Sequence, residues 1–255
     1  MDNQLFDLHG KKALITGGSR GLGRQMALAF AKNGADVAIV SRKLDKCEEV
    51  VREIEGLGRR GFAYPCHVGR WQDLEKMVED VETNFGEIDI LVNNAGLSPL
   101  YPSLRDVSEE LFDKVVAINM KGPFRLMALV GSKMVERENG GSIINVSSTA
   151  SIAPSPGSQP YGAAKAGLNA LTAAFAHEYG PSVRVNCIMA GPFLTDISKA
   201  WDMDAFAKRA ERMALKRGGN PEEVIGAALY FASNASSFAT GSVLQLDGGY
   251  MGNGE

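Results

Sequence analysis

The stretch Thr16-Gly17-Gly18-Ser19-Arg20-Gly21-Leu22-Gly23 joins the apolar run Lys12–Thr16 to a helical pattern over Gly23–Asn33. Glycines at such a junction let the backbone turn sharply and let a phosphate group approach it closely. The free N–H groups and the dipole of the following helix favour negative charge. The order strand, glycine turn, helix therefore predicts a pyrophosphate-binding turn, although a glycine-rich turn alone is also consistent with a purely structural role.

Runs of apolar, often β-branched residues recur along the rest of the chain and predict buried parallel strands. The predicted strands are Lys12–Thr16, Asp36–Ser41, Gly61–Cys66, Ile88–Val92, Ser142–Ser147, Val183–Ile188 and Val243–Leu246. Helical patterns such as Leu44–Leu57 and Trp71–Phe85 lie between them, each followed by a glycine that is typical of a helix end. This alternation predicts an α/β chain with one domain over 1–255: a Rossmann-type, doubly wound parallel sheet with helices on both faces.

The composition argues for a small-molecule function. The 255 residues are 45% hydrophobic and carry a net charge of −3, so no basic surface indicates binding to nucleic acid or to an anionic membrane. No run approaches the ~18 apolar residues of a membrane span. The three cysteines match neither a redox pair nor a zinc pattern, so we expect buried, reduced thiols, no metal site and a cytoplasmic location.

A tyrosine and a lysine four residues apart, Tyr161 and Lys165, would share one face of a helix. The nearby ammonium favours the phenolate form and is expected to lower the pKa of Tyr161. Bringing the pKa from ~10 to neutrality needs about 4 kcal/mol of differential interaction, which the ammonium and the positive charge of a bound nucleotide cofactor could supply together. Proton transfer at working pH would then be possible, although such a pair is also consistent with an exposed helix surface.

Together the glycine turn, Asn93-Asn94-Ala95-Gly96, Tyr161-Gly162-Ala163-Ala164-Lys165 and Leu246-Asp247-Gly248-Gly249 resemble the motifs of the short-chain dehydrogenase/reductase family, over about residues 10–250. The resemblance implies hydride transfer between a nicotinamide cofactor and a carbonyl or alcohol. It implies Tyr161 as the general acid or base, Ser148 as the hydroxyl that polarises the carbonyl, and Asn119 as the fourth catalytic residue, through a water linked to Lys165.

The resemblance also implies the cofactor contacts, from the glycine turn, the NNAG motif, the catalytic pair and a loop that holds the nicotinamide. These residues are Gly17, Ser19, Arg20, Gly21, Leu22, Gly23, Asn94, Ala95, Gly96, Tyr161, Lys165, Phe193 and Thr195. Ala190 stands where the family usually has proline, so the nicotinamide loop is expected to be less rigid.

The end of the second predicted strand indicates which nicotinamide cofactor binds. NAD-binding folds place an acidic residue there, but this chain has Ser41-Arg42-Lys43. Arg20 adds a second cation, so Ser41, Arg42 and Arg20 predict a site for the 2′-phosphate of NADP(H). His67 and Val68 would contact adenine, where the family usually has aspartate; a histidine without a role is equally consistent.

The substrate would be enclosed by residues 97–101, residues 153–160 and a lid at about 193–215. The apolar lid residues Leu194, Ile197, Trp201, Met203, Phe206 and Met213 favour a hydrophobic ketone or aldehyde, or else pack against the core or a second subunit.

Two short segments, residues 66–69 and 155–157, loosely resemble NADP-dependent carbonyl and retinal reductases. The alternatives are a 3-oxoacyl-carrier-protein or sugar/polyol reductase, and a protein that senses NADP(H) without turnover. A homotetramer is expected by resemblance, with a long amphipathic helix over Glu109–Val135 and an alanine-rich face over Tyr161–Ala176 suited to close packing.

Overall fold

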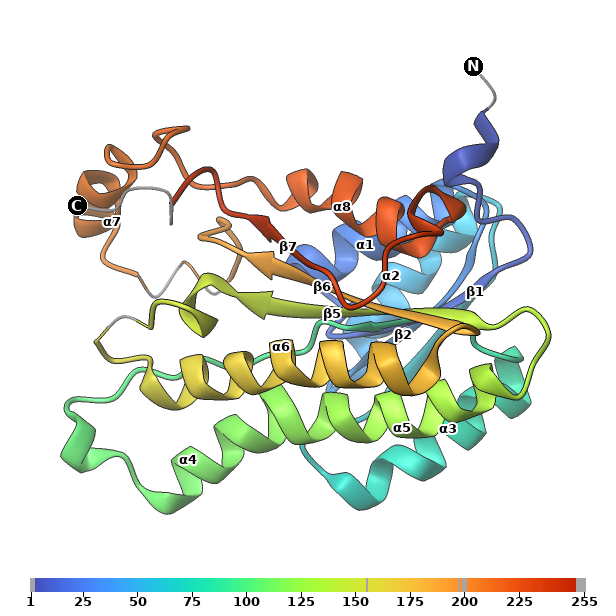
Figure 1. Cartoon of the computed structure of the whole chain (residues 1–255), viewed down its shortest axis with the longest axis horizontal. Helices are drawn as coiled ribbons and strands as arrows, with labels where there is room; N and C mark the ends of the chain where they lie inside the picture. Colours follow the sequence, from blue (N-terminus) through green and yellow to red (C-terminus); the bar gives the residue numbers. More distant parts are fainter. Residues whose placement is uncertain (1–2, 155, 197, 199–200, 251–255) are drawn as a thin grey trace.

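The computed structural model describes residues 3–154, 156–196, 198 and 201–250. At its centre lies one sheet of seven parallel strands in the order β3-β2-β1-β4-β5-β6-β7 (Figure 1). The strands are β1 (Lys12–Thr16), β2 (Asp36–Ser41), β3 (Gly61–Pro65), β4 (Ile90–Asn93), β5 (Gly141–Ser148), β6 (Val183–Ala190) and β7 (Val243–Leu246). The strand order reverses between β1 and β4, which confirms the predicted doubly wound, Rossmann-type sheet.

Eight α-helices lie among the described residues, with shorter 3-10 turns between them. The helices are α1 (Gly21–Lys32), α2 (Leu44–Gly56), α3 (Trp71–Phe85), α4 (Glu109–Val116), α5 (Gly122–Val135), α6 (Gln159–Tyr179), α7 (Met203–Ala210) and α8 (Ile225–Ala232). The 3-10 turns are Asn3–Phe6, Leu104–Asp106, Thr149–Ser151, Pro221–Val224 and Asn234–Ser236.

Side chains of successive strand residues enter two separate cores, one on each face of the sheet. Ile15 packs with Phe30 of α1 and Phe231 of α8 on one face. Leu14 packs with Met77 of α3 and Leu168 of α6 on the other. Figure 1 shows the same layers, with α1, α2 and α8 on one side and α3, α5 and α6 on the other. Burial on both faces explains why these strands are almost uniformly apolar.

The structure differs from the predicted boundaries mainly at the site. β5 and β6 continue in register as far as Ser148 opposite Ala190, beyond their predicted ends. The predicted helix over Glu109–Val135 is interrupted by a π-helical segment, Ala117–Lys121. Pro123 contributes no N–H to the helix, and the side chain of Asn119 occupies the Val115 carbonyl, so regular α-helical bonding is replaced here.

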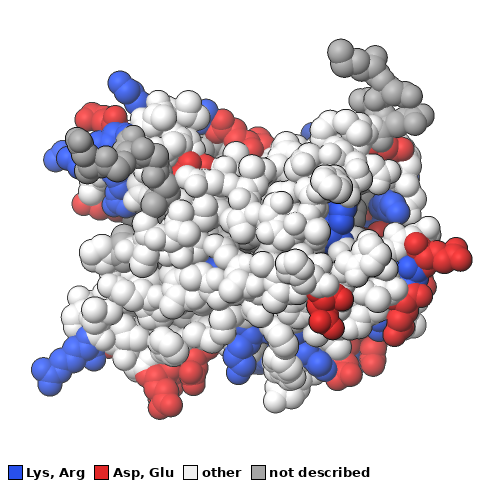
Figure 2. Space-filling model, in the orientation of Figure 1, with Lys and Arg blue, Asp and Glu red and all other residues white. Residues whose placement is uncertain are grey.

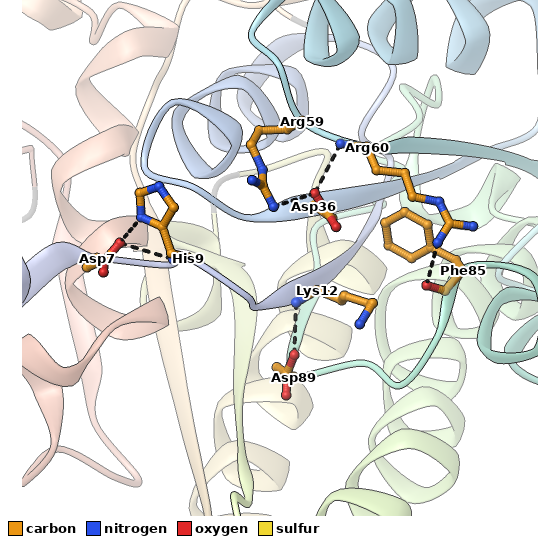
Figure 3. A network of polar contacts seen from close by, with 8 residues as sticks. All are labelled: Asp7, His9, Lys12, Asp36, Arg59, Arg60, Phe85 and Asp89. Carbon is orange, nitrogen blue, oxygen red and sulfur yellow. Dashed lines mark hydrogen bonds and ion pairs between the residues drawn. The ribbon is translucent and has the colours of Figure 1, made fainter.

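A polar network joins the segments where the strands begin (Figure 3). Asp36 accepts hydrogen bonds from Arg59 Nη2 at 2.7 Å and from the Arg60 backbone at 3.0 Å. Asp89 accepts from the backbone N–H of Lys12 at 2.8 Å, while its own N–H donates to the Lys12 carbonyl. These carboxylates therefore fasten β2 and β1 to the loops that precede the neighbouring strands.

The structure also bears on membrane spans, metal ligands and the cysteines. The described residues contain no helix long and apolar enough to cross a membrane. Within them no three or more His, Cys, Asp or Glu side chains gather as metal ligands. Cys47, Cys66 and Cys187 are buried, as the sequence predicted.

Asp89 tests how much the contact between β1 and the loop before β4 contributes to stability. Asp89→Ala removes the acceptor for the Lys12 N–H and a charge 3.9 Å from Arg137, so we expect a loss of about 1–3 kcal/mol in the free energy of unfolding. Urea denaturation measures it. Glu49→Ala, which removes only an exposed ion pair with Lys46, is the control and should cost under about 0.5 kcal/mol. Equal effects of the two changes would contradict this role of Asp89.

Candidate functional site

The glycine turn lies at the carboxyl end of β1 and leads into α1. Gly17 has a φ of 64°, and a Cβ there would lie 2.9 Å from the Ala95 Cα. A Cβ at Gly23 would lie 2.3 Å from the Gly17 carbonyl oxygen, so α1 packs directly on the turn. The N-terminus of α1 has no side-chain cap. The first N–H groups of α1, at Gly21, Leu22 and Gly23, have no partner within the helix itself and therefore suit a phosphate anion.

Thr16, which the sequence reasoning did not single out, holds this turn to the NNAG motif. Its hydroxyl donates to the Val92 carbonyl and accepts from the backbone N–H groups of Asn94 and Ala95, at 3.1–3.2 Å. The Asn94 amide donates to the carbonyls of Thr16 and Gly17 at 3.1 Å. The Asn94 side chain and the N–H groups of Asn94 and Ala95 are thus engaged in holding the turn. Contact of Asn94, Ala95 and Gly96 with the ribose stays a prediction. The only signal in the sequence was a threonine at the strand end.

Arg42 and Arg20, which were predicted to bind the 2′-phosphate, do not line the same cavity among the described residues. Arg42 lines a cavity of about 490 Å³ together with His67, at the carboxyl ends of β2 and β3. Among the described residues, Arg20 is not part of this lining, and its guanidinium lies 3.8 Å from the Asp196 carboxylate. Ser41 is half-buried, and its hydroxyl lies 3.1 Å from the Cys47 sulfur. Ser19 is half-buried within the turn itself.

His67 is held in one orientation, because its Nδ1 accepts a hydrogen bond from the Gly69 backbone at 3.2 Å. Burial lowers the pKa of His67, and the charges of Arg42, Arg70 and Lys114 act in the same direction. The ring is therefore neutral near pH 7, with Nε2 as its donor. Val68 is buried beside Gly122, which has no room for a side chain. Contact of His67 and Val68 with adenine stays a prediction.

Ser148, Tyr161 and Lys165 meet where β5 ends and α6 begins. Ser148 is the last residue of β5, and Tyr161 is the third residue of α6. The Ser148 hydroxyl lies near enough to the Tyr161 hydroxyl to act on its pKa. The Lys165 ammonium lies 5.8 Å from the centre of the Tyr161 ring and donates to the Val146 carbonyl at 2.7 Å. The i, i+4 spacing on α6 thus places the three side chains together, as the sequence predicted for Tyr161 and Lys165.

Burial shifts the pKa values of both Tyr161 and Lys165. Burial raises the pKa of Tyr161, and the hydrogen bond to Ser148 only partly opposes this. Burial also lowers the pKa of Lys165 to about 8. The protein's own groups thus leave the pKa of Tyr161 raised, because burial outweighs the effect of Ser148. A shift toward neutrality, expected from Lys165 together with the nicotinamide cation, stays a prediction. At pH 7 Tyr161 is a neutral phenol, that is, a proton donor.

Asn119 lies fully buried in the π-helical segment and anchors the loop that follows the NNAG motif. Its Nδ2 donates to the Leu97 and Val115 carbonyls at 2.8 and 2.9 Å, and its Oδ1 accepts from the Leu97 N–H at 3.2 Å. A Cβ at Gly96 would lie 3.2 Å from Asn119 Oδ1 and 3.8 Å from Lys165 Nζ. The absent side chain of Gly96 thus leaves room between Asn119 and Lys165.

The predicted nicotinamide loop and lid begin at Phe193, which is buried and bridges to Gly219. Thr195 lies beside Gly21, where an added Cβ would be 3.5 Å from it. In the lid, Phe206, Ala210 and Met213 form a small core with Trp201 and Tyr250. Phe206 and Met213 therefore pack within the lid, while Leu194 and Met203 remain exposed. Ile197 lies outside the described residues.

A doubly wound sheet that carries a phosphate-binding turn and a serine, tyrosine and lysine set along one edge belongs to the nicotinamide-dependent oxidoreductases. A family model described as "Enoyl-(Acyl carrier protein) reductase" matches residues 17–251. The chain belongs to the short-chain dehydrogenase/reductase family.

The similarity to known members of the family extends over almost the whole chain. Dehydrogenase/reductase SDR family member 4 of Pongo abelii is 37% identical over 245 residues, which cover 95% of this chain and 88% of that protein. The 3-oxoacyl-[acyl-carrier-protein] reductase FabG of Thermotoga maritima is also 37% identical, covering 96% and 99%. The crystal structure of the NADPH-dependent 3-quinuclidinone reductase of Rhodotorula rubra superposes with a TM-score of 0.92 at 28% identity, covering 99% and 97%.

The buried ammonium of Lys165 yields a prediction about stability. The unfolded chain binds more protons than the folded chain between about pH 8 and 10.5, so the destabilising contribution of Lys165 is complete below pH 8 and fades as pH rises through that interval. Lys165→Met removes this cost and should therefore stabilise the protein at pH 7. The gain is limited to about 1–3 kcal/mol, because the change also leaves the Val146 carbonyl without its donor. The gain should shrink toward pH 10.

Urea unfolding at pH 7 and pH 10 measures both values. Lys208→Met, at an exposed lysine of α7, is the matched control and should change stability by under about 0.5 kcal/mol at either pH. A Lys165→Met protein less stable than wild type at pH 7 would show that the buried ammonium is not a net cost.

Proposed function

We propose that this chain interconverts a carbonyl and an alcohol with NADP(H), using Tyr161 as the general acid in reduction and the general base in oxidation. The observation that carries the proposal is that Ser148 at the end of β5 and Tyr161 at the start of α6 come together beside the buried ammonium of Lys165, which lies 5.8 Å from the centre of the Tyr161 ring. Two hydroxyls that meet at one point can both bond to a substrate oxygen. A charged lysine next to them favours negative charge on that oxygen.

The residues at this edge divide the chemistry between them. Ser148 donates a hydrogen bond to the carbonyl oxygen and so stabilises the charge that develops there. Tyr161, neutral at pH 7, donates its proton to the same oxygen, and the Lys165 ammonium stabilises the phenolate left behind. When bound, the nicotinamide cofactor would supply the hydride to the carbonyl carbon. One hydride and one proton convert the carbonyl to the alcohol.

Reprotonation of Tyr161 would pass through Lys165. We propose that the space beside Gly96, between Asn119 Oδ1 and Lys165 Nζ, serves this path, with Asn119 holding a water there. The Asn119 side chain is fixed by its bonds to Leu97 and Val115, so its oxygen has a constant position.

The residues present fit NADP(H). The uncapped start of α1 and the glycine turn would hold the pyrophosphate, with Thr195 and Phe193 near the nicotinamide. No carboxylate stands in Ser41-Arg42-Lys43, at the end of β2, where NAD-binding folds place one. Arg42 and Arg20 would bind the 2′-phosphate. The NADPH-dependent relative with a TM-score of 0.92 supports this choice.

A hydrophobic ketone or aldehyde is the proposed substrate class. Leu100 and Ile152, from the two loops around Ser148 and Tyr161, are exposed apolar side chains, and Leu194 lies at the start of the lid. The lid over 193–215 stays a prediction. The 37% identity to a 3-oxoacyl-carrier-protein reductase supports the alternative of an acyl-chain substrate. A protein that only senses NADP(H) would not need Ser148, Tyr161 and Lys165 together.

We propose a homotetramer acting in the cytoplasm as one domain. Ala163, Ala166 and Ala170 leave an exposed strip of small side chains along α6, and Phe112 and Phe124 are exposed on α4 and α5. Figure 2 shows few charged side chains over β5, β6 and the start of α6. Small and apolar surfaces of this kind suit close packing of helices between subunits.

Tyr161→Phe tests the general acid. A panel of hydrophobic ketones, aldehydes and diketones, with a 3-oxoacyl thioester, is first assayed with NADPH by loss of its absorbance. The variant should lose at least ~100-fold in kcat for the best substrate, the low end of the usual contribution of a general acid. NADPH affinity, measured by fluorescence titration, should stay within about twofold because only one hydroxyl is removed. Single-turnover reduction at the wild-type rate would exclude Tyr161 as the proton donor.

Arg20→Ala combined with Arg42→Ala tests the cofactor. The preference for NADPH over NADH in kcat/KM should fall by at least ~100-fold, about 2.7 kcal/mol, because both cations are proposed to bind a phosphate that NADH lacks. Arg52→Ala, at an exposed arginine of α2, is the control and should leave the preference unchanged. A wild-type preference for NADH would overturn the assignment of NADP(H).

A further inference from the structure

Tyr101 lies in the loop between β4 and α4 and makes two hydrogen bonds to the first residue of α6. Its hydroxyl accepts from the backbone N–H of Gln159 at 3.1 Å and donates to the Gln159 side-chain oxygen. Both residues are half-buried. The bonds join segments 58 residues apart in the sequence, and they end two residues before Tyr161.

This contact supplies a cap that α6 lacks. The N-cap residue of α6, Ser158, makes no capping hydrogen bond with its side chain. Pro160 has no N–H, and the Gly162 N–H bonds to the Ser158 carbonyl at 2.7 Å. The Gln159 N–H is therefore one of the few donors in the first turn that need an external acceptor, and the Tyr101 hydroxyl is that acceptor.

The same loop is fastened at its other end to Asn119. Asn119 bonds to both the carbonyl and the N–H of Leu97, at 2.8 and 3.2 Å. Residues 97–101 thus span from the π-helical segment to the first turn of α6, and Leu100, 75% exposed, stands between the two anchors. A shift of the loop at Tyr101 would act on the turn of α6 that carries Tyr161.

We propose that Tyr101 is a positioning residue: its hydroxyl fixes the first turn of α6 and thereby the position of the Tyr161 hydroxyl during proton transfer. The inference rests on the proposed carbonyl reduction. It assigns to Tyr101 an effect on kcat, whereas a residue that only lines the substrate site would change KM.

Tyr101→Phe tests this, because it removes the hydroxyl and keeps the ring. We expect kcat for the best panel substrate to fall about three- to tenfold, the range that one or two hydrogen bonds support, with KM and the NADPH dissociation constant within about twofold. Hydrogen exchange, measured by mass spectrometry on the folded protein, should become faster at residues 159–162. Gln159→Ala should lower kcat in the same direction, and the double variant should be less than additive.

Tyr179→Phe is the matched control, since it removes a tyrosine hydroxyl that bonds to the Met127 carbonyl at the other end of α6. It should leave kcat and the exchange of residues 159–162 unchanged. Wild-type kcat in Tyr101→Phe, a change confined to KM, or an equal loss of kcat in Tyr179→Phe would each overturn the role of Tyr101. A wild-type protein that reduces no panel member instead contradicts the proposed function, and this inference falls with it.

Discussion

The parallel pairing of β1 with β4, with Thr16 opposite Asn93, is the constraint on which the site depends. It places the ends of both strands at one edge of the sheet, so that the glycine turn and the NNAG motif meet there. The Thr16 hydroxyl then joins the two segments through three hydrogen bonds. A shift of this register by one residue would separate the phosphate-binding turn from its support.

Buried polar contacts extend this order from the cofactor turn to the catalytic helix. The Asn93 amide donates to Asn145 Oδ1 of β5 at 2.9 Å, and the Asn145 amide donates to Thr172 of α6, also at 2.9 Å. Because buried polar groups are costly without partners, this chain of contacts specifies how β4, β5 and α6 pack. Lys165 extends from the same helix, and its burial lowers its pKa at the expense of stability. The helix α6 thus takes part in the buried polar contacts and also carries the buried ammonium of Lys165, which lowers stability.

Much of the fold could be predicted from local sequence, since apolar runs and glycine stops mark elements whose existence depends on neighbours along the chain. Gly58 and Gly86 follow α2 and α3, as predicted, and both have a positive φ. The strand ends at Ser148 and Ala190 could not be predicted, because they depend on pairing between β5 and β6. The π-helical segment depends on where the buried Asn119 side chain finds acceptors.

The candidate site shows the same division. Tyr161 and Lys165 could be paired from their spacing alone, because a helix fixes that geometry. Thr16 and Tyr101 act through residues 76–79 and 58 positions away, and no local pattern records such contacts. The burial that raises the pKa of Tyr161 could not be predicted, because spacing indicates a neighbouring charge but not the depth of burial.

The central claim is that hydride passes to a carbonyl carbon, and the family model that matches this chain carries the description of an enoyl reductase. Benzylideneacetone offers both a ketone and a carbon–carbon double bond to the same site. The most direct measurement incubates it with NADPH deuterated at the transferred position and locates the label by mass spectrometry and NMR. Hydride transfer to the carbonyl carbon predicts deuterium on the carbinol carbon of the unsaturated alcohol. Deuterium on the former double bond, with the ketone intact, would contradict it.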